Sequence, residues 1–431
     1  MTQLRSVVIG LILAVVVVVV LQPIYFFGMA NLDRVISHDA MRAHFRDAFQ
    51  SGVLSDELHP TNLLFTVGDR YTDCIALSAG MQPDQSALDL GILAPVPPSD
   101  RHSCEYLRDI ADGNFESLTW SGYYRYWHGY RVYYAPLASL LPIYALRLVN
   151  LLLLAAFTAG FFWQSSKLIG RSAAVALVMP LFFLSDLVRV WQVTPHVLGV
   201  IVILAGAAIF SFAVRRRMSD YALLVMSAAF GSFHNFIDFL VNPPWMPMLL
   251  AFFVLAGLKQ EGRRSQTLAI AVTLSWFGGY ALTWVSKWVI CYFLFPDIDV
   301  ISKIRSMIQF RINGDYSKVV HLPLFPTLKV LQAAIVSWGA PVFAIYLYSL
   351  FKDLKKRNFG WRPFWLLAWP SLIPPIWFEI LSNHSQIHAG VTSRSEAAAI
   401  GVLIAAVVIC FEAAGAFEDT PQTKGLAVTP A

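Results

Sequence analysis

The chain has 431 residues, of which 57% are hydrophobic and only 14% are charged, and its mean hydropathy is +0.58. Soluble proteins carry charge on about a quarter of their residues, so this composition excludes an ordinary soluble domain and indicates a multi-pass membrane protein. The formal net charge of +5 does not indicate a nucleic-acid-binding protein, because the basic residues gather in short patches between apolar runs.

Windows of about 20 apolar residues, the length that crosses the hydrocarbon core, predict an all-α integral membrane protein with about ten transmembrane helices. We expect these helices at about 6–28, 138–164, 172–186, 195–214, 220–240, 244–258, 266–294, 326–350, 363–381 and 395–414. The third run is short and contains Pro180, which leaves the number of spans open by two.

Basic patches mark one side of the membrane. They comprise Arg5, then Lys167 and Arg171, then Arg215, Arg216 and Arg217, then Lys259, Arg263 and Arg264, and finally Lys352, Lys355, Lys356 and Arg357. Since cytoplasmic loops carry the excess of lysine and arginine, both termini are expected in the cytoplasm. The first run is long for a signal peptide, and "FGMANL" is a poor cleavage site, so we interpret it as a signal anchor.

The predicted organisation has four parts. Residues 1–30 form the first transmembrane helix, 31–134 an exterior loop, 135–414 a polytopic helical bundle and 415–431 a cytoplasmic tail. Within the loop, "NLDRVISHDAMRAHFRDAF" has helical apolar spacing and predicts a helix lying on the membrane surface. The loop also holds Cys74 and Cys104, for which an exterior location favours a disulfide over two free thiols.

Two aspartates in the loop are candidate catalytic groups. The run "HPTNLLFTVGDRYTDCIALSAGM" contains Asp69 and Asp73, four positions apart. Such carboxylates can act as a general base or as metal ligands, although acidic residues in a solvated loop need have no chemical role.

A run of aromatic and basic residues precedes the second predicted span. In "SGYYRYWHGYRVYYAP", Trp127 and the tyrosines can stack on sugar rings, while Arg125 and His128 can hold anionic or hydroxylated groups. We therefore expect this run to line the rim of an exterior site. The alternative is an interfacial aromatic belt with a snorkelling arginine.

Ionisable residues near the exterior ends of other spans predict a shared polar cavity. "GSFHNFIDFLVNPPWMP" contributes His234 and Asp238, "LTWVSKWVICYFLF" contributes Lys287, and "FEILSNHSQIHAGVTSRSEA" contributes Glu379, His384, His388, Arg394 and Glu396. Such residues are costly inside a membrane and usually face a cavity or one another. Each one alone could instead belong to an ion pair or snorkel to the interface. His384 and His388 have helical ligand spacing but no evident third ligand, so neither a metal nor a cofactor is predicted.

A polar cavity beneath a large loop after the first span resembles the GT-C superfamily of lipid-linked glycosyltransferases. A more specific resemblance is to a group of bacterial multi-pass membrane proteins for which little function is established. It is carried by four runs in this order: "DRYTD", "RYWHGY", "HNFIDFLVNPP" and "NHSQIHAGVTSR". The GT-C resemblance implies transfer of a sugar from a polyprenyl phosphate donor to an envelope glycan, lipid or protein acceptor. It also implies an active site on the outer face of the bacterial inner membrane.

The same resemblance implies an aspartate or glutamate of the first exterior loop as the base. Many GT-C enzymes have an acidic pair directly after the first span, whereas here Asp33 and Asp39 stand alone. The base therefore remains open between Asp39, Asp69 and Asp73.

The remaining site assignments follow from the reaction. Cleaving a sugar from phosphate requires cations on the leaving group, for which the exterior candidates are Lys287, Arg305, Arg311 and Arg394. The expected substrate-binding residues are Arg125, Trp127, His128, His234, Asp238 and His384. The expected partners are the lipid-linked donor, a glycan or lipid acceptor and membrane lipids, with no nucleic acid.

Two other functions remain as alternatives. A transporter or flippase of an envelope precursor is disfavoured, since no internal repeat is evident and such proteins rarely need an exterior loop of about a hundred residues. An exterior acyltransferase would use His234 with Asp238. The sequence has no Walker A, G-x-G-x-x-G after a strand, H-E-x-x-H or G-x-S-x-G motif, so it does not support an ATPase, a dinucleotide enzyme, a zinc protease or a typical esterase.

Overall fold

The described part of the computed structural model comprises residues 2–55, 69–97, 101–258, 261–314, 319–337, 339–354 and 359–418. Within these ranges the chain is all-helical, and the extended pairing is confined to an isolated bridge between Val96 and Ser121. Most of the predicted tail, and Lys259 and Lys355 to Arg357 of the basic patches, lie outside the described residues.

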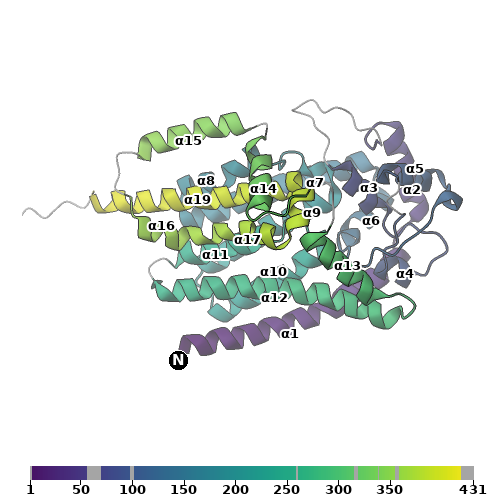
Figure 1. The fold of residues 1–431 in the computed structure, drawn as a ribbon, viewed down its shortest axis with the longest axis horizontal. Coiled ribbons are helices and arrows are strands. Elements are labelled where there is room, and N and C mark those ends of the chain that lie inside the picture. The colour runs from purple at the N-terminus through teal and green to yellow at the C-terminus, as the bar shows by residue number, and fades with distance from the viewer. Residues whose placement is uncertain are drawn as a thin grey trace, which may run out of the picture.

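Among the described residues, five helices are long and apolar enough to cross a membrane, and a bent pair of shorter helices would make six if it is one span. The five helices are α1 (Thr2–Ala30), α7 (Ile143–Ile169), α9 (Thr194–Arg215), α12 (Arg263–Leu294) and α19 (Ala389–Glu418). Figure 1 shows α1, α12 and α19 running along the long axis of the molecule. The chain is thus an α-helical membrane protein in its architecture.

The prediction of ten transmembrane helices is not confirmed. Three predicted spans correspond to shorter helices, α8 (Arg171–Phe183), α10 (Asp220–Ile237) and α11 (Trp245–Gly257). Pro180 lies inside α8, which ends at Phe183. A helix of 13 residues, such as α8 or α11, rises only about 20 Å at 1.5 Å per residue, which is less than the hydrocarbon thickness.

Two further predicted spans are broken. In place of 326–350 there are α14 (Phe325–Ile335) and α15 (Ala340–Leu354), bent by 91°. At this bend a Cβ on Gly339 would lie 2.6 Å from the carbonyl oxygen of Phe183, so the chain approaches α8 too closely for a side chain. In place of 363–381 there are α16 (Trp361–Ala368), η5 (Trp369–Leu372) and α17 (Ile373–Ile380), interrupted where Pro370 and Pro374 supply no backbone N–H.

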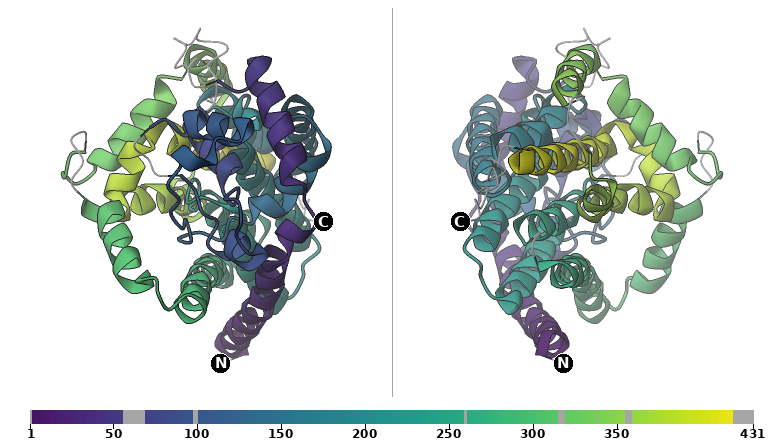
Figure 2. Two further views of the ribbon diagram at one scale, coloured as in Figure 1. Left: turned by 90° about the vertical axis from the view of Figure 1, so that its right-hand side faces the viewer. Right: turned by 90° about the vertical axis from the view of Figure 1, so that its left-hand side faces the viewer.

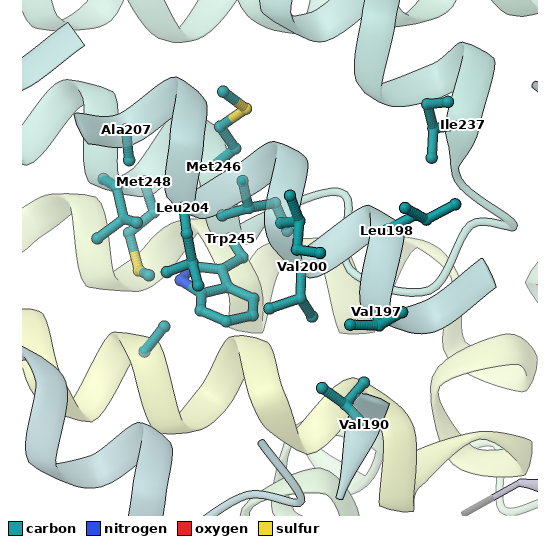
Figure 3. Close-up of a cluster of buried hydrophobic side chains, with 14 of the residues drawn as sticks. Val190, Val197, Leu198, Val200, Leu204, Ala207, Ile237, Trp245, Met246 and Met248 are labelled. Atoms are coloured by element: carbon teal, nitrogen blue, oxygen red, sulfur yellow. The ribbon is translucent and has the colours of Figure 1, made fainter. Parts of the chain in front are cut away.

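The centre of the bundle is α11, whose residues from Trp245 to Ala256 are all buried. A helix that is apolar all round requires neighbours on every side, and α9, α12 and α19 contact it. Figure 3 shows Trp245 packed between Leu204 and Val200 of α9. The short α11 is therefore a buried core helix.

The segment between α1 and α7 folds into a helical domain at one end of the bundle, which we call the cap (Figures 1 and 2). Its elements are η1 (Leu32–Arg34), α2 (His38–Gln50), α3 (Arg70–Ser78), α4 (Ala87–Ile92), α5 (Ser103–Asp112), η2 (Phe115–Ser117) and α6 (Tyr130–Leu140). The helix expected on the membrane surface is α2, but its apolar residues Met41, Phe45 and Ala48 are buried and α2 packs on α5 and α6. The apolar face of α2 therefore packs in the interior of the cap and does not face a membrane surface.

A disulfide bond fixes the position of α3 in the cap. Cys74 of α3 is joined to Cys104 of α5, as expected from the sequence, with Cα atoms 5.0 Å apart. The hydroxyl of Ser103 donates to the carbonyl of Tyr71 at 2.6 Å, a second tie between the same helices.

The "RYWHGY" run joins the cap to the bundle. The indole N–H of Trp127 donates to the carbonyl oxygen of Thr283 at 2.7 Å. The backbone N–H of Gly129 donates to the carbonyl oxygen of Phe236, also at 2.7 Å. A Cβ on Gly129 would lie 2.5 Å from that same oxygen, so only glycine permits this approach to α10. The run therefore docks the cap onto α10 and α12.

Candidate functional site

A cavity of about 220 Å³ lies where the cap meets the bundle, and we call it the polar cavity. Its walls come from α3, the "RYWHGY" run, the start of α9, the segment after α10, α13 (Val300–Asn313), α18 (Ser382–Ile387) and the start of α19. The lining residues are Asp69, Tyr71, Thr72, Ile75, Tyr123, Arg125, Tyr126, His196, Phe239, Val241, Arg311, His384, His388 and Val391. Segments far apart in the sequence thus contribute one group of polar side chains.

Asp69 is the carboxylate of the polar cavity. It is the N-cap of α3, where one oxygen accepts from the backbone N–H of Thr72 at 3.0 Å and the other from the Thr72 hydroxyl. Each carboxylate oxygen has a second lone pair, so Asp69 can still accept a proton or a hydrogen bond from the cavity. Burial acts to raise the pKa of Asp69, but the facing His196 and the hydrogen bonds from Thr72 outweigh it and hold the pKa below its ordinary value.

His196, in the first turn of α9, faces Asp69, and a hydrogen bond from Arg394 orients its imidazole ring. The Nη2 of Arg394 donates to Nδ1 of His196 at 3.4 Å. Arg394 is itself held by a bidentate ion pair with Asp186. A nitrogen that accepts from arginine carries no proton, so the other nitrogen, Nε2, carries it. Asp186, Arg394 and His196 thus form a chain that ends at the polar cavity beside Asp69.

Two arginines on the cavity wall are not neutralised. Arg125 donates to the hydroxyl of Tyr123 at 2.9 Å, and Arg311 donates to the hydroxyl of Tyr126 at 3.2 Å and to Nδ1 of His384. Neither has a carboxylate partner among the described residues, whereas three other buried or nearly buried arginines, Arg131, Arg147 and Arg394, are each paired with an aspartate. Two unpaired cations facing one cavity provide a site for an anion.

His384 of α18 and His388, which directly follows this helix, complete the wall. His384 lies beside His388, with ring centroids 4.7 Å apart, and its Nε2 lies 2.8 Å from the carbonyl oxygen of Leu240. Burial and the charge of Arg311 lower the pKa of both, that of His388 to about 4, so both are neutral at pH 7. Among the described residues, no group of three His, Cys, Asp or Glu side chains is arranged to hold a metal ion.

An apolar passage joins the polar cavity from the side. Next to the cavity lies a hollow of about 240 Å³, the neck, which shares Arg125, Tyr126 and Arg311 with it. The neck adjoins a hollow of about 840 Å³ between α12 and α13, which we call the groove. Neck and groove share Trp288, Ile304 and Ile308, and the groove is otherwise lined by Val285, Val289, Tyr292, Phe293, Val300, Ile301, Arg305, Gln309, Ile312 and Asn313.

The other two candidate bases lie outside the lining of the polar cavity. Asp73 is buried, and its oxygens accept from Arg147 and from the backbone N–H of Thr194, each at 3.0 Å. Burial raises the pKa of Asp73, although Arg147 opposes this. Asp39 has an exposed side chain paired with Arg42. Of the three candidates, Asp69 alone lines the polar cavity.

Several predicted substrate ligands serve packing instead. Lys287 donates to the carbonyl of Ile92 and lies 5.0 Å from the ring centroid of Trp127, so both hold the cap on α12. His128 is buried with Nε2 2.6 Å from the carbonyl oxygen of Tyr123, and burial lowers its pKa. None of the three lines the polar cavity, because Trp127 and His128 turn inward where the run docks and Lys287 of α12 is buried against them. Of the predicted phosphate ligands, Arg311 lines the cavity, Arg305 lines the groove and Arg394 lies behind His196.

His234 and Asp238 are also buried behind the cavity wall. Asp238 accepts from the backbone N–H of Val241 at 2.9 Å and so holds the turn after α10. Both nitrogens of His234 lack a hydrogen-bond partner within the part of the chain that is described. The two side chains do not form the expected acid and base pair of an acyltransferase.

The polar cavity thus combines one ionised carboxylate, two unpaired guanidiniums and neutral imidazoles, next to an apolar groove. Such an arrangement suits an amphiphile with an anionic head, and it allows proton transfer to the carboxylate. Comparison with protein-family models, curated proteins and solved structures finds no match to this chain.

Proposed function

We propose that the chain is a membrane glycosyltransferase of the GT-C type, which takes a sugar from a polyprenyl phosphate donor. The observation that carries this proposal is that the polar cavity, the neck and the groove adjoin in this order, each sharing lining side chains with the next. A substrate that fills both must have a polar, anionic head and a long apolar tail. A lipid-linked sugar phosphate has both features.

In the proposed complex the phosphate lies between Arg125 and Arg311, where the cavity meets the neck. The lipid leaves through the groove, whose apolar lining suits an isoprenoid chain. The sugar then lies in the polar cavity beside Asp69. This arrangement requires no carboxylate to be displaced, since neither arginine has one as a partner among the described residues.

The proposed reaction is a direct displacement at the anomeric carbon. The acceptor hydroxyl oxygen forms a bond to that carbon as the bond from carbon to phosphate oxygen breaks, and the electron pair leaves with the polyprenyl phosphate. Asp69 takes the proton of the hydroxyl. Arg125 and Arg311 stabilise the charge that develops on the leaving phosphate.

The cap faces the cell exterior in this proposal, as the basic patches indicate. Arg215, Arg216 and Arg217 follow α9 at the end opposite the cap, and Lys167 and Arg171 lie where α7 and α8 meet at that same end. The positive-inside rule then assigns the cap, and the site beneath it, to the outer face of the membrane.

The test uses purified protein in nanodiscs with a panel of synthetic undecaprenyl phosphate sugars, and it measures release of undecaprenyl phosphate. We expect Asp69→Asn to lower turnover by about a hundredfold or more while binding of undecaprenyl phosphate is retained, since asparagine is also an effective N-cap. Arg311→Met should weaken that binding as well as turnover.

Matched control variants are available in the cap. Asp39→Asn removes an exposed carboxylate, and Arg101→Met removes an arginine whose pair with Asp109 is exposed. Both should behave as wild type. Full activity of Asp69→Asn, or no binding of undecaprenyl phosphate by the wild-type chain, would exclude the proposed function.

A further inference from the structure

A second hollow adjoins the polar cavity between the cap and α13, and we call it the polar arm. It has a volume of about 400 Å³ and shares Tyr71, Ile75, Tyr123 and Arg125 with the polar cavity. The cap supplies most of its remaining walls, and its other lining residues are Val96, Pro97, Ser121, Gly122, Tyr124, Lys303, Ile304 and Met307.

The polar arm and the groove adjoin α13 at different but neighbouring faces. At about 100° per residue, Lys303 of the arm is nearly opposite to Ile301 and Ile312 of the groove around the helix axis, whereas Ile304 lines both hollows and Met307 lines both the arm and the neck. The groove is bounded by α12 and α13, whereas the polar arm is bounded by the cap and α13. The polar cavity is therefore adjoined by both the neck and the polar arm, and Arg125 lines all three.

The groove and the polar arm differ in chemistry. The groove is lined by aliphatic and aromatic side chains with few polar groups. The polar arm presents the rings of Tyr71, Tyr123 and Tyr124, the exposed cation of Lys303 and the backbone of Gly122. The hydroxyl of Tyr124 is buried without a hydrogen-bond partner among the described residues.

We infer that the polar arm binds the acceptor, and that the acceptor is a glycan chain that arrives from water. This inference rests on the proposed function. A sugar ring has an apolar face of C–H groups and a rim of hydroxyls, which matches flat tyrosine rings with hydroxyls at their edges. An acceptor lipid would need an uninterrupted apolar passage, whereas in the polar arm Arg125, Lys303 and Ser121 lie among the apolar and tyrosine side chains.

The position of the polar arm suits transfer. Tyr71 lines both the arm and the polar cavity and lies two residues after Asp69. A glycan seated on the tyrosines can thus extend a hydroxyl toward Asp69, which takes its proton, while the donor sugar enters from the groove. Arg125 lies at the junction and contacts both the donor phosphate and the acceptor.

The test blocks the polar arm from its two walls. Ser121→Trp and Lys303→Trp place an indole in the arm from exposed positions on the cap and on α13, and Thr119→Trp is the matched control at an exposed cap position outside the lining. Labelled protein in nanodiscs is applied to an array of neutral, amino-sugar and uronate oligosaccharides. Binding of undecaprenyl phosphate is measured separately on each variant.

We expect the wild type and Thr119→Trp to bind at least one class of oligosaccharide, and both blocking variants to lose about tenfold or more of that affinity. Binding of undecaprenyl phosphate should be unchanged in all of them. Absence of binding across the array, or saccharide binding that survives both blocks, overturns the inference. Failure of the proposed function can be distinguished from failure of this inference, because the wild type would then not bind undecaprenyl phosphate.

Discussion

Asp69 has two roles that can be separated experimentally. As an N-cap it accepts from Thr72, and as a cavity residue it faces His196 and His388. The first role needs only an acceptor oxygen, which asparagine also provides. The second needs a negative charge, which asparagine lacks.

The pH dependence of stability follows from the pKa of Asp69. Although burial acts to raise it, His196 and Thr72 lower it below the ordinary value, so the folded protein holds this carboxylate ionised at lower pH than the unfolded chain does. Its contribution to stability is therefore present above roughly pH 4 and is lost as the pH falls through the folded pKa. We expect Asp69→Asn to unfold at a lower temperature than wild type at pH 7, and the two melting temperatures to converge toward pH 3. Parallel thermal unfolding in detergent measures this, and a constant difference across the range would contradict it.

His196 offers a second test at the residue scale. Since Arg394 donates to Nδ1, the proton on Nε2 is directed toward the cavity. His196→Gln retains an N–H group near the position of Nε2, whereas His196→Leu does not. We expect the leucine variant to lose at least about tenfold more turnover than the glutamine variant, at similar melting temperatures. Equal turnover in the two variants would assign His196 to packing alone.

Sequence reasoning identified some of these side chains and missed others. Arg125, Arg311, His384 and Asp69 were predicted, and all line the polar cavity. Asp69 and Asp73 could not be distinguished, because a spacing of four residues suggests one helical face, whereas Asp69 precedes α3 as its N-cap. His196 was missed because its run "TPHVLGV" reads only as the start of an apolar helix, and its partners Asp186 and Arg394 are distant in sequence.

At the element scale, Asp73 ties α3 to two helices of the bundle. It accepts from Arg147 of α7 and from the first residue of α9, and the site depends on this placement of α3. Removing one partner of a buried ion pair leaves the other charge uncompensated and costs about 3 kcal/mol.

We therefore expect Arg147→Met to lower the free energy of unfolding by about 3 kcal/mol, because it leaves the buried Asp73 carboxylate without its cation. Asp109→Asn, whose pair with Arg101 is exposed, should change it by less than about 1 kcal/mol. Combining Asp73→Asn with Arg147→Met should restore part of the loss. Chemical denaturation in detergent measures all three, and unchanged stability of Arg147→Met would contradict this role.

The elements themselves were only partly predictable. The helical spacing of Met41 and Phe45 correctly indicated α2, but an amphipathic pattern does not say whether a membrane or α5 covers the apolar face. Hydropathy also identified apolar runs without showing that prolines and the close approach of Gly339 to α8 break two of them. Short helices such as α11 were counted as spans because a fully buried helix is as apolar as one that faces lipid.

For the whole molecule, the groove makes a prediction about lipid binding. Ile308 lines both the neck and the groove, so Ile308→Trp should fill the passage and weaken binding of undecaprenyl phosphate by about tenfold or more. Ile12→Trp, on an exposed face of α1, is the matched control and should bind as wild type. Binding to nanodisc-embedded protein measures both, and equal affinity of the two variants would exclude the groove as the lipid site.

In the proposed complex the carrier lipid lies in the groove and the acceptor in the polar arm, and this use of two hollows has a kinetic consequence. With one entrance, a spent carrier and an elongated product would have to leave in a fixed order. With two entrances, the lipid carrier can be exchanged through the groove while the product remains bound in the polar arm. Successive sugar additions then occur during a single encounter with the acceptor. At low ratios of enzyme to acceptor, products would then form a few long chains beside untouched acceptor, whereas a distributive enzyme would lengthen all chains evenly.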